Sequence, residues 1–459
     1  MKTYNLETKD KIGEVVKLAG WVQKRRDHGQ LIFIDLRDST GIIQVIFNEK
    51  LYKEAEKLGI EDVVGIEGLV KERPQGMQND KIATGKVEIE AQTLQVLSKA
   101  KLPPFELDKD TKKVDEETRM KYRYLDLRSA RMHKNLIMRS KITKFIRDYM
   151  IEKKFIEIET PYITKGTPEG AREYVIPARL HPGKFYVLPQ SPQQFKQLLM
   201  ISGVERYFQI ARCFRDEDPR GDRQPEHTQL DLEMSFVKQE DIWKIVEELM
   251  IKLVEKLYPD KKITAIPFPK LTYIQAKEKY NSDKPDLRND KNNDDELAFG
   301  WIYDFPMFTK DDQGEITAEH HPFVMPNEDD LELLEKDPSK VRAYSYDLVL
   351  NGYEIASGSI RIHKKEVQEK IFKLLNLSEE QTREKFGNFL AAFEYGVPPH
   401  GGIAPGIDRL AMILQKETSI REVIAFPKTG DGRDLMMGAP STLSQKQLDE
   451  LGISIKPEK

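Results

Sequence analysis

Short runs in which apolar and polar residues alternate occupy residues 1–104. They read LAGWVQ, LIFIDL, IIQVIF, DVVGIEGLV and KVEIEAQTLQVL, and a charged stretch with helical character, LYKEAEKLG, separates the third from the fourth. Alternation with a period of two is typical of strands that bury one face. Three strands, a helix and two further strands is the order of a five-stranded Greek-key barrel. We therefore predict an OB-fold domain at residues 1–104.

The rest of the chain combines helical patterns with antiparallel strand patterns. The segment LPPFELDKDTKKVDEE, with paired prolines followed by charges, opens a predicted linker or hinge at residues 105–130. In residues 131–459, a helical pattern leads into FIEIETPYI, and RYFQIARCF and TQLDLEMSF flank a charged loop. Runs of antiparallel strands with segregated helices predict an α+β domain, in which helices flank an antiparallel sheet.

Composition limits the classes of protein to which this chain can belong. The 73 Lys and Arg residues nearly balance the 77 Asp and Glu residues, so the formal net charge is −4 and a polyanionic partner would have to meet a local patch. No apolar run approaches the roughly 18 residues of a membrane span, and the first residues lack the apolar core of a signal peptide. We therefore expect a soluble, cytoplasmic protein with no membrane partner. The single cysteine, Cys213, excludes a disulfide framework and is expected to be a buried packing residue.

Two neighbouring strands of the first domain carry side chains suited to binding single-stranded nucleic acid. Alternation places Phe33 on one face of LIFIDL and Gln44 on a face of IIQVIF, near the cations at 24–26. An aromatic ring can stack on a base, an amide can bind a Watson–Crick edge, and cations can bind phosphate. The alternative, with Phe33 in the core and the cations on a solvated turn, is equally favoured, because residues 1–104 hold 17 basic and 16 acidic residues.

The common nucleotide-binding motifs are absent, and three other segments take their place. Neither G-x-x-x-x-G-K-[ST] nor G-x-G-x-x-G follows a strand pattern. The three segments are FIEIETPYI with TKGTPEGA, YFQIARCFRDEDPRGDRQPEHTQLDLEMSF, and GGIAPGIDRLAMIL. Together they resemble motifs 1, 2 and 3 of the class II aminoacyl-tRNA synthetases. LPQSPQQFKQLLM, EHHPF, NGYEIASGSIRIH and PPHGGIAPGIDRL narrow the resemblance to the bacterial-type aspartyl-tRNA synthetases, over almost all of the chain.

That resemblance implies an enzyme that uses ATP to join L-aspartate to tRNA(Asp) through an aspartyl-adenylate, with the OB-fold domain binding the anticodon. It implies an aspartate site formed by Glu169, Gln193, Lys196, Arg215, Asp231, His320 and Arg361. A guanidinium at Arg361 could clamp the side-chain carboxylate of aspartate through two parallel hydrogen bonds. One feature departs from the family, because the usual large insertion is reduced here to a short polar loop near residues 288–300.

The resemblance also implies an ATP site and a Mg²⁺ site. The implied ATP contacts are Arg215, Glu217, Gln224, His227, Glu354, Ser359, Gly406, Ile407, Asp408 and Arg409, of which Arg215, Glu217 and Arg409 are the implied catalytic residues. His227 stands where the family usually has a phenylalanine that stacks on adenine. Asp347 and Glu354 resemble the carboxylates that hold Mg²⁺, an ion that prefers oxygen ligands.

For the tRNA, the resemblance implies an anticodon-binding wall formed by Arg26, Phe33, Gln44 and Glu88, flanked by His28 and Gly76. A His/Gly pair at these two positions resembles members that charge both tRNA(Asp) and tRNA(Asn). The alternative is that His28 and Gly76 simply belong to turns. The resemblance further implies a homodimer, with Pro161 at its interface.

Other functions remain open at this point. The nearest is an asparaginyl or lysyl enzyme, although a lysine site needs an acid in place of Arg361 and an asparagine site has little use for Lys196. A synthetase-like protein that only binds RNA would have no evident need for its active-site arginines. The adjacent His320 and His321 are disfavoured as a metal pair, because neighbouring side chains diverge and no further Cys/His cluster joins them. Asp347, taken alone, would be an ordinary surface carboxylate.

Overall fold

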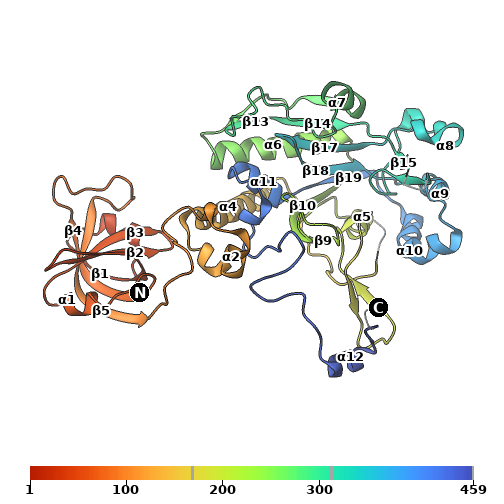
Figure 1. Cartoon of the computed structure of the whole chain (residues 1–459). Coiled ribbons are helices and arrows are strands. Elements are labelled where there is room, and N and C mark those ends of the chain that lie inside the picture. The colour runs from red at the N-terminus through yellow and green to blue at the C-terminus, as the bar shows by residue number, and fades with distance from the viewer. Residues whose placement is uncertain (167–169, 311–313, 457–459) are drawn as a thin grey trace. The chain divides into compact units, whose positions relative to one another are not determined.

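The structure, a computed structural model, describes residues 1–166, 170–310 and 314–456 (Figure 1). The chain divides into two compact units, Met1–Arg131 and Met132–Lys459. Within the described residues, every helix is too short or too polar to cross a lipid bilayer.

The first unit is built on a five-stranded barrel. Its elements are η1 (Asn5–Asp10), β1 (Val15–Asp27), β2 (Ile32–Asp38), β3 (Gly41–Phe47), α1 (Tyr52–Ala55), β4 (Val63–Glu72) and β5 (Val87–Ser98). The barrel is closed in the order β1-β2-β3-β5-β4, and β3 and β5 run parallel. Ile32, Ile34 and Leu36 are fully buried, whereas Phe33 and Asp35 are partly exposed. The predicted alternation and the predicted OB-fold are therefore confirmed.

Residues 105–130, predicted to be a linker or hinge, form short helices with buried charges. The helices are η2 (Thr111–Lys113), α2 (Glu116–Lys121) and α3 (Arg123–Asp126). The buried carboxylate of Asp126 accepts a hydrogen bond from Arg123 Nη1 at 2.8 Å. Arg128 Nη1 donates to Glu61 of the barrel at 2.9 Å. This segment is therefore packed into the first unit and is not a solvated tether.

The second unit is built on an eight-stranded sheet with the order β12-β14-β17-β18-β19-β10-β9-β6. These strands are β6 (Ile156–Glu157), β9 (Arg206–Phe214), β10 (Glu226–Ser235), β12 (Lys270–Thr272), β14 (Phe299–Tyr303), β17 (Ser345–Leu350), β18 (Tyr353–Ile360) and β19 (His400–Pro405). The pairs are antiparallel except at the two edges, where β12 pairs with β14 and β6 with β9 in parallel. The predicted antiparallel hairpin of RYFQIARCF and TQLDLEMSF is confirmed as β9 and β10.

Helices and small hairpins surround this sheet (Figure 1). The helices are α4 (Ala130–Glu152), α5 (Gln193–Ile201), α6 (Gln239–Leu257), α7 (Tyr273–Tyr280), α8 (Leu333–Lys336), α9 (Lys365–Leu374), α10 (Glu379–Ala392), α11 (Ile407–Leu414) and α12 (Gln445–Leu451). The remaining strands are β7 (Val175–Pro177), β8 (Phe185–Val187), β11 (Lys262–Ile263), β13 (Glu296–Leu297), β15 (Phe308–Lys310) and β16 (Ile316–Ala318). Short 3₁₀ turns, η3 to η6, lie at 328–330, 338–340, 393–395 and 420–422.

One face of the sheet is apolar and packs against α4, α6 and α11 in a single hydrophobic core. Trp243 of α6 stacks on Trp301 of β14 with ring centroids 5.5 Å apart. Leu230 and Leu232 of β10 also lie in this core and are fully buried. Because side chains alternate along a strand, Asp231, which lies between these leucines, points to the opposite face of the sheet.

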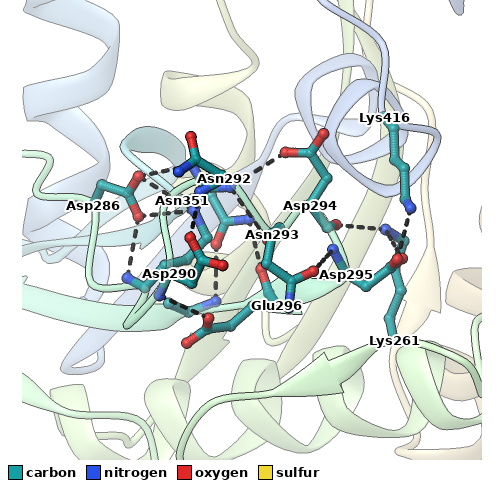
Figure 2. A network of polar contacts seen from close by, with 12 residues as sticks. Lys261, Asp286, Asp290, Asn292, Asn293, Asp294, Asp295, Glu296, Asn351 and Lys416 are labelled. Carbon is teal, nitrogen blue, oxygen red and sulfur yellow. Dashed lines mark hydrogen bonds and ion pairs between the residues drawn. The ribbon is translucent and has the colours of Figure 1, made fainter.

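The polar run predicted near residues 288–300 is a loop, but it is shorter than predicted. It ends at Asp295, because the strands β13 and β14 follow, with mainly apolar and buried side chains. Figure 2 shows that the loop is held by its own polar groups and by Lys261 and Lys416, which bind Asp295. Asn351 bonds to the backbone of Glu296 and Ala298, directly after the loop. The carboxylate of Glu296 accepts hydrogen bonds from the backbone N–H groups of Asn289 (2.8 Å) and Asp290 (3.1 Å).

Strand β6 is also shorter than FIEIETPYI predicts. It ends at Glu157, because only Ile156 and Glu157 pair with β9. Next to it, Ile156, Tyr162 and Ile163 are 55%, 44% and 53% exposed, so the segment around Pro161 presents an apolar surface. On β9, Cys213 is buried, as expected.

Candidate active site

A cavity of about 440 Å³ opens on the polar side of the sheet. Its lining includes most of the residues predicted for the aspartate and ATP sites, namely Gln193, Lys196, Arg215, Glu217, Gln224, His227, Asp231, His320, Glu354, Ser359, Arg361, Gly406, Asp408 and Arg409. Ile407 and Asp347 do not line it. Glu169 lies outside the described residues. The fold thus brings residues from distant parts of the chain to one cavity.

Strand β10 and its neighbour β19 both contribute residues to the lining of this cavity. Asp231 and Glu233 of β10 are fully buried. Opposite Glu233 on β19 stands Gly402, where an added Cβ would lie 2.1 Å from Glu233 Oε2. The same Cβ would lie 2.1 Å from the backbone oxygen of Leu232. Gly402 must therefore be a glycine for both the backbone of β10 and the carboxylate of Glu233 to fit, which accounts for one glycine of the GGIAPG sequence.

Two cations and two carboxylates form a buried ionic cluster at the amino-acid end of the cavity. Lys196 Nζ lies 3.0 Å from Asp231 Oδ2 and 3.5 Å from Glu233 Oε2. Arg361 donates from Nε to Glu233 Oε1 at 2.9 Å and from Nη2 to Oε2 at 3.2 Å. Burial alone would raise the pKa of Glu233, but the charges of Arg361 and Lys196 outweigh burial and lower it. Burial raises the pKa of Asp231 despite its contact with Lys196.

Glu233 is absent from the predicted site, although it is the carboxylate that both cations share. The signal was present in the sequence, because Asp231 and Glu233 alternate on the same face of one strand. Glu233 does not line the cavity. It acts on the site by holding Lys196 and Arg361.

Arg361 has fewer free hydrogen-bond donors than the predicted two-bond clamp requires. Besides the two bonds to Glu233, its Nη1 contacts Ser359 Oγ and lies 2.8 Å from His321 Nε2. A guanidinium has five N–H groups, so these four contacts leave one N–H, on Nη2. A bidentate grip on a substrate carboxylate would therefore require the carboxylate to displace His321 or Ser359.

The two adjacent histidines have different surroundings. His320, the histidine predicted to contact aspartate, packs edge-on against Phe305 with ring centroids 4.9 Å apart. Its Nε2 is buried without a hydrogen-bond partner in the described part of the chain. His321, which was not predicted, is the histidine that contacts Arg361. Burial, and then the charge of Arg361, lower the pKa of His321 well below its usual value. Its Nδ1 accepts from Phe323 N at 3.2 Å, so a neutral ring carries its hydrogen on Nε2 and cannot accept from Arg361. A substrate carboxylate could therefore replace this contact.

Another part of the cavity is lined by two arginines and a histidine. Arg215 Nε is buried and has no hydrogen-bond partner among the described residues. Arg409, in contrast, donates from Nη1 to Glu354 O at 2.7 Å and from Nε to Asp222 O at 3.2 Å. Burial, and then the charges of Arg215 and Arg409, lower the pKa of His227 to about 3. His227 is therefore uncharged near neutral pH, and of the two arginines it is Arg215 whose Nε lacks a partner among the residues that the structure describes.

Several residues predicted to contact ATP are already engaged by protein groups. The amide of Gln224 accepts from Lys428 N at 2.7 Å and donates to Lys428 O at 3.1 Å. Ser359 is bound to Arg361. Glu217 lies 3.4 Å from Arg223 Nη1. Their side chains thus join segments of the site to each other.

The turn that contains Gly406, Ile407 and Asp408 is likewise tied to its surroundings. Asp408 accepts a hydrogen bond from Thr228 N at 2.8 Å and another from Arg139 of α4. Gly406 N donates to Ile355 O at 2.8 Å. Ile407 is fully buried in the core, so a nucleotide could contact only its backbone.

Asp347 and Glu354, the predicted Mg²⁺ ligands, come from the hairpin of β17 and β18. Asp347 is 6% exposed, so it is not an ordinary surface carboxylate. Its Oδ1 has no hydrogen-bond partner in the part of the chain that the structure describes. Burial, and then the charge of Glu354, raise the pKa of Asp347 well above its usual value.

In the barrel, three of the predicted anticodon residues form one hydrogen-bonded chain. Gln44 Nε2 donates to Glu88 at 2.9 Å, and Gln44 Oε1 lies 3.3 Å from Arg26 Nη2. Arg26 also binds Asp35 through two bonds, of 2.9 and 2.7 Å. Asp35 was not predicted, although it alternates with Phe33 on the same face of β2. It fixes the direction of the Arg26 guanidinium.

His28 and Gly76, which were predicted to flank the anticodon-binding wall, have different surroundings in the barrel. The ring of His28 meets the ring of Phe33 edge-on at 5.3 Å, which puts His28 beside the predicted wall. Gly76 has a φ of +86° in a turn closed by a hydrogen bond from Met77 N to Pro74 O at 2.9 Å. The turn itself thus favours glycine at this position, which supports the turn alternative for Gly76. His28 also belongs to a turn, between β1 and β2, where its N–H donates to Leu31 O at 3.0 Å.

Comparison with known protein families gives two matches. Residues 115–430 match the family described as tRNA synthetases class II (D, K and N). Residues 16–97 match the family described as OB-fold nucleic acid binding domain. Each match falls on the part of the chain where the corresponding fold was observed.

Two relatives align with nearly the whole chain. A protein of Rubrobacter xylanophilus, named aspartate–tRNA(Asp/Asn) ligase, is 43% identical over 571 aligned residues, which cover 97% of this chain and 95% of that protein. A Bacillus subtilis protein of the same name is 42% identical over 578 residues, which cover 98% and 97%. Both alignments are longer than the 459 residues of this chain. Both relatives therefore contain residues without a counterpart here, in agreement with the missing insertion.

Solved structures give the same fold. The asparaginyl-tRNA synthetase of Pyrococcus horikoshii complexed with asparaginyl-adenylate superposes with a TM-score of 0.76 at 23% identity, covering 94% of this chain and 98% of that one. At this identity the likeness concerns the fold alone. The family matches and the full-length relatives go further: the chain belongs to the class II tRNA synthetases of the D, K and N group, with an OB-fold nucleic-acid-binding domain.

Proposed function

We propose that this protein activates L-aspartate with ATP and transfers the aspartyl group to tRNA(Asp) and also to tRNA(Asn). The observation that carries the proposal is the buried cluster of Lys196, Arg361, Asp231 and Glu233, of which the first three line the same cavity as Arg215. Buried polar atoms of Asp231, Arg215 and His320 lack partners among the described residues, as expected of groups that a polar substrate completes. The names of the two full-length relatives support the same reaction.

Exchange of labelled pyrophosphate into ATP, measured with each of the twenty amino acids, tests the proposal. We expect exchange with aspartate alone, because the cluster offers two cations to one extra carboxylate. Exchange driven mainly by lysine or asparagine would contradict the proposed substrate. Absence of exchange with all twenty, together with binding of tRNA, would instead indicate an RNA-binding relative without catalysis.

In the proposed first step, an oxygen of the α-carboxylate attacks the α-phosphorus of ATP, the bond to the bridging oxygen breaks, and pyrophosphate leaves. Two anions have to meet, so the main tasks of the protein are positioning and charge stabilisation. Arg215 suits both tasks, since its Nε has no hydrogen-bond partner among the described residues. In the second step, a hydroxyl of the terminal ribose of the tRNA attacks the carbonyl carbon, and AMP leaves.

The pair of Asp347 and Glu354 fits a Mg²⁺ ion in this proposal. Carboxylate oxygens are ligands that Mg²⁺ prefers, and Asp347 Oδ1 is buried without a hydrogen-bond partner among the described residues. The raised pKa of Asp347 reflects burial and repulsion between the two carboxylates, which a cation would relieve. When bound, the ion would neutralise charge on the triphosphate. No cluster of three or more metal-binding side chains occurs in the described residues, so phosphate and water would supply its other ligands.

A homodimer, formed around Pro161, is also part of the proposal. The exposed apolar side chains of Ile156, Tyr162 and Ile163 support an interface at this segment. Analytical ultracentrifugation would give the oligomeric state directly.

Replacing His227 with phenylalanine should change ATP affinity only modestly, by about 1 kcal/mol or less. Both side chains offer a flat ring to adenine, and His227 is already uncharged because its pKa is about 3. ATP affinity of the unmodified protein should accordingly show no titration of this group between pH 6 and pH 8. The measurement is calorimetry of ATP binding at several pH values. A hundredfold loss of affinity in the variant would show that the imidazole has a specific role.

Phe33→Ala should weaken aminoacylation and leave aspartate activation unchanged. The variant removes a surface on which a base can stack, which is worth about 1–3 kcal/mol, or roughly a fivefold to 150-fold loss in kcat/KM for tRNA. Aspartate-dependent pyrophosphate exchange reports activation separately, since it needs no tRNA. Equal damage to both reactions would make Phe33 a folding residue of the barrel.

Purified tRNA(Asn) should be charged with aspartate at an efficiency comparable to that of tRNA(Asp). The barrel supports this expectation, because His28 lies against Phe33 and an imidazole can donate or accept a hydrogen bond according to its tautomer. Aminoacylation of each tRNA transcript at equal concentration provides the comparison. An efficiency for tRNA(Asn) more than about a thousandfold lower, equivalent to roughly 4 kcal/mol, would show that the enzyme discriminates.

A further inference from the structure

Three buried polar side chains form a continuous hydrogen-bonded relay next to the cavity. Gln193 and Gln197 lie one turn apart on α5, and Gln193 Nε2 is 3.2 Å from Gln197 Oε1. Gln197 Nε2 is 3.2 Å from Nε2 of His400, the first residue of β19. His400 Nδ1 is 2.8 Å from the carbonyl oxygen of Pro398. Gln197 and His400 are fully buried, and only Gln193 lines the cavity.

The carbonyl at the end of this relay fixes the direction of every bond in it. A carbonyl oxygen can only accept, so His400 Nδ1 carries a hydrogen. Burial lowers the pKa of His400, which keeps the ring neutral and leaves Nε2 as an acceptor. Gln197 must then turn its NH₂ group toward His400 and its oxygen toward Gln193. Gln193 in turn donates from its NH₂ group, and its oxygen Oε1 remains.

We propose that Gln197 and His400 are positioning residues that hold the amide of Gln193 with its oxygen available to the substrate, as an acceptor for the ammonium of aspartate. The inference rests on the proposed function, since it concerns how aspartate is bound. No described residue donates to Gln193 Oε1. The only hydrogen-bond donors that ionised aspartate carries are those of its ammonium, so an amide oxygen in this cavity can bind aspartate only there.

A charged His400 would reverse the relay. With hydrogens on both ring nitrogens, His400 would donate from Nε2 to the amide oxygen of Gln197. The NH₂ group of Gln197 would then donate to the oxygen of Gln193. Gln193 would present its NH₂ group to the cavity, where it would repel an ammonium and attract a carboxylate. The buried neutral histidine therefore determines which end of aspartate this glutamine binds.

The test compares Gln197→Met with the matched control Gln194→Met. Methionine keeps the length of the side chain and removes the amide, and Gln194 lies on the same helix outside both the relay and the cavity lining. In pyrophosphate exchange, Gln197→Met should raise the KM for aspartate about tenfold, the loss expected for an unsatisfied buried polar group. The KM for ATP, and the inhibition constant of succinate, which is aspartate without its ammonium, should change less than twofold. Gln194→Met should leave all three constants within twofold.

A second comparison uses Gln193→Ala and the double variant Gln193→Ala/Gln197→Met. If the relay acts through Gln193, the double variant should have the same KM for aspartate as Gln193→Ala alone. Independent effects that multiply would overturn the inference, as would equal weakening of aspartate and succinate by Gln197→Met. Failure of the proposed function would be visible separately, as absence of aspartate-dependent exchange by the unmodified protein.

The relay can also be examined in the unmodified protein, in case Gln197→Met does not fold. Histidine labelled with ¹⁵N distinguishes the two neutral tautomers and the charged ring by NMR, and the His400 signals are those lost in His400→Gln. We expect the neutral form with hydrogen on Nδ1 between pH 6 and pH 8. A charged ring, or hydrogen on Nε2 alone, would overturn the inference.

Discussion

Arg361→Leu should reduce the kcat/KM of aspartate-dependent pyrophosphate exchange by about 10³-fold. The guanidinium is 2% exposed and binds Glu233 through two hydrogen bonds. Its removal leaves the side-chain carboxylate of aspartate, together with Glu233, in a desolvated site with Lys196 as the nearest remaining cation. Removing one partner of a buried ion pair typically costs 3–5 kcal/mol, and each 1.4 kcal/mol is a factor of ten in rate.

Two further variants separate loss of binding from loss of folding. Arg361→Lys keeps the charge but not the planar guanidinium, so we expect its kcat/KM for aspartate to lie between those of Arg361→Leu and the unmodified protein. The double variant Glu233→Gln/Arg361→Leu also removes the carboxylate that Arg361→Leu leaves without its arginine. It should therefore unfold at a higher temperature than Arg361→Leu and remain inactive. Aspartate kinetics of Arg361→Leu close to those of the unmodified protein would contradict the assignment of Arg361 to the amino-acid site.

The barrel was predictable from the sequence because its strands bury one face and expose the other. Ile32, Ile34 and Leu36 repeat with a period of two, which is a strand pattern and not a helical one, and the turns between the first three strands are short. The helices at residues 111–126 were not predictable in this way, because what stabilises them is the pairing of Asp126 with buried arginines. Such pairing leaves no periodic pattern of apolar residues in the sequence.

For the site, motif resemblance predicted residue types, whereas their hydrogen-bond partners are visible only in the structure. Motif resemblance predicted Arg361 and Asp231 as site residues. It carried no information on the contacts that Glu233 and His321 already make with the guanidinium of Arg361. The same limit applies to Gln224, whose amide both accepts from and donates to the backbone of Lys428, a residue 204 positions away. Hydrogen bonds between distant segments depend on tertiary packing, and a single sequence does not encode them as a local signal.

Asparagine should support exchange about 10⁴-fold less efficiently than aspartate, and the charges at the amino-acid end of the cavity give the reason. Among the described residues predicted to contact aspartate, Lys196, Arg361 and Arg215 contribute three positive charges and Asp231 contributes one negative charge, and Glu233 behind them contributes another. His320 and His321 add none, since their pKa values are lowered, chiefly by burial. The ammonium and α-carboxylate of either amino acid cancel each other, so within this group of residues only the side-chain carboxylate of aspartate balances the remaining positive charge.

The free cluster is itself balanced, because Lys196 and Arg361 are paired with Asp231 and Glu233 before any substrate arrives. Asparagine would therefore not leave two bare cations, and rejection has to come from the excess charge near Arg215 and from the amide NH₂ group that would face donors of Lys196 and Arg361. A site that leaves buried polar groups unpaired with the wrong substrate can reject it by 10⁴-fold or more. The ratio of kcat/KM in pyrophosphate exchange, with asparagine freed of traces of aspartate, measures this rejection. A ratio below about a hundred would mean that internal pairing of the cluster removes most of its selectivity, and that the enzyme needs another means to exclude asparagine.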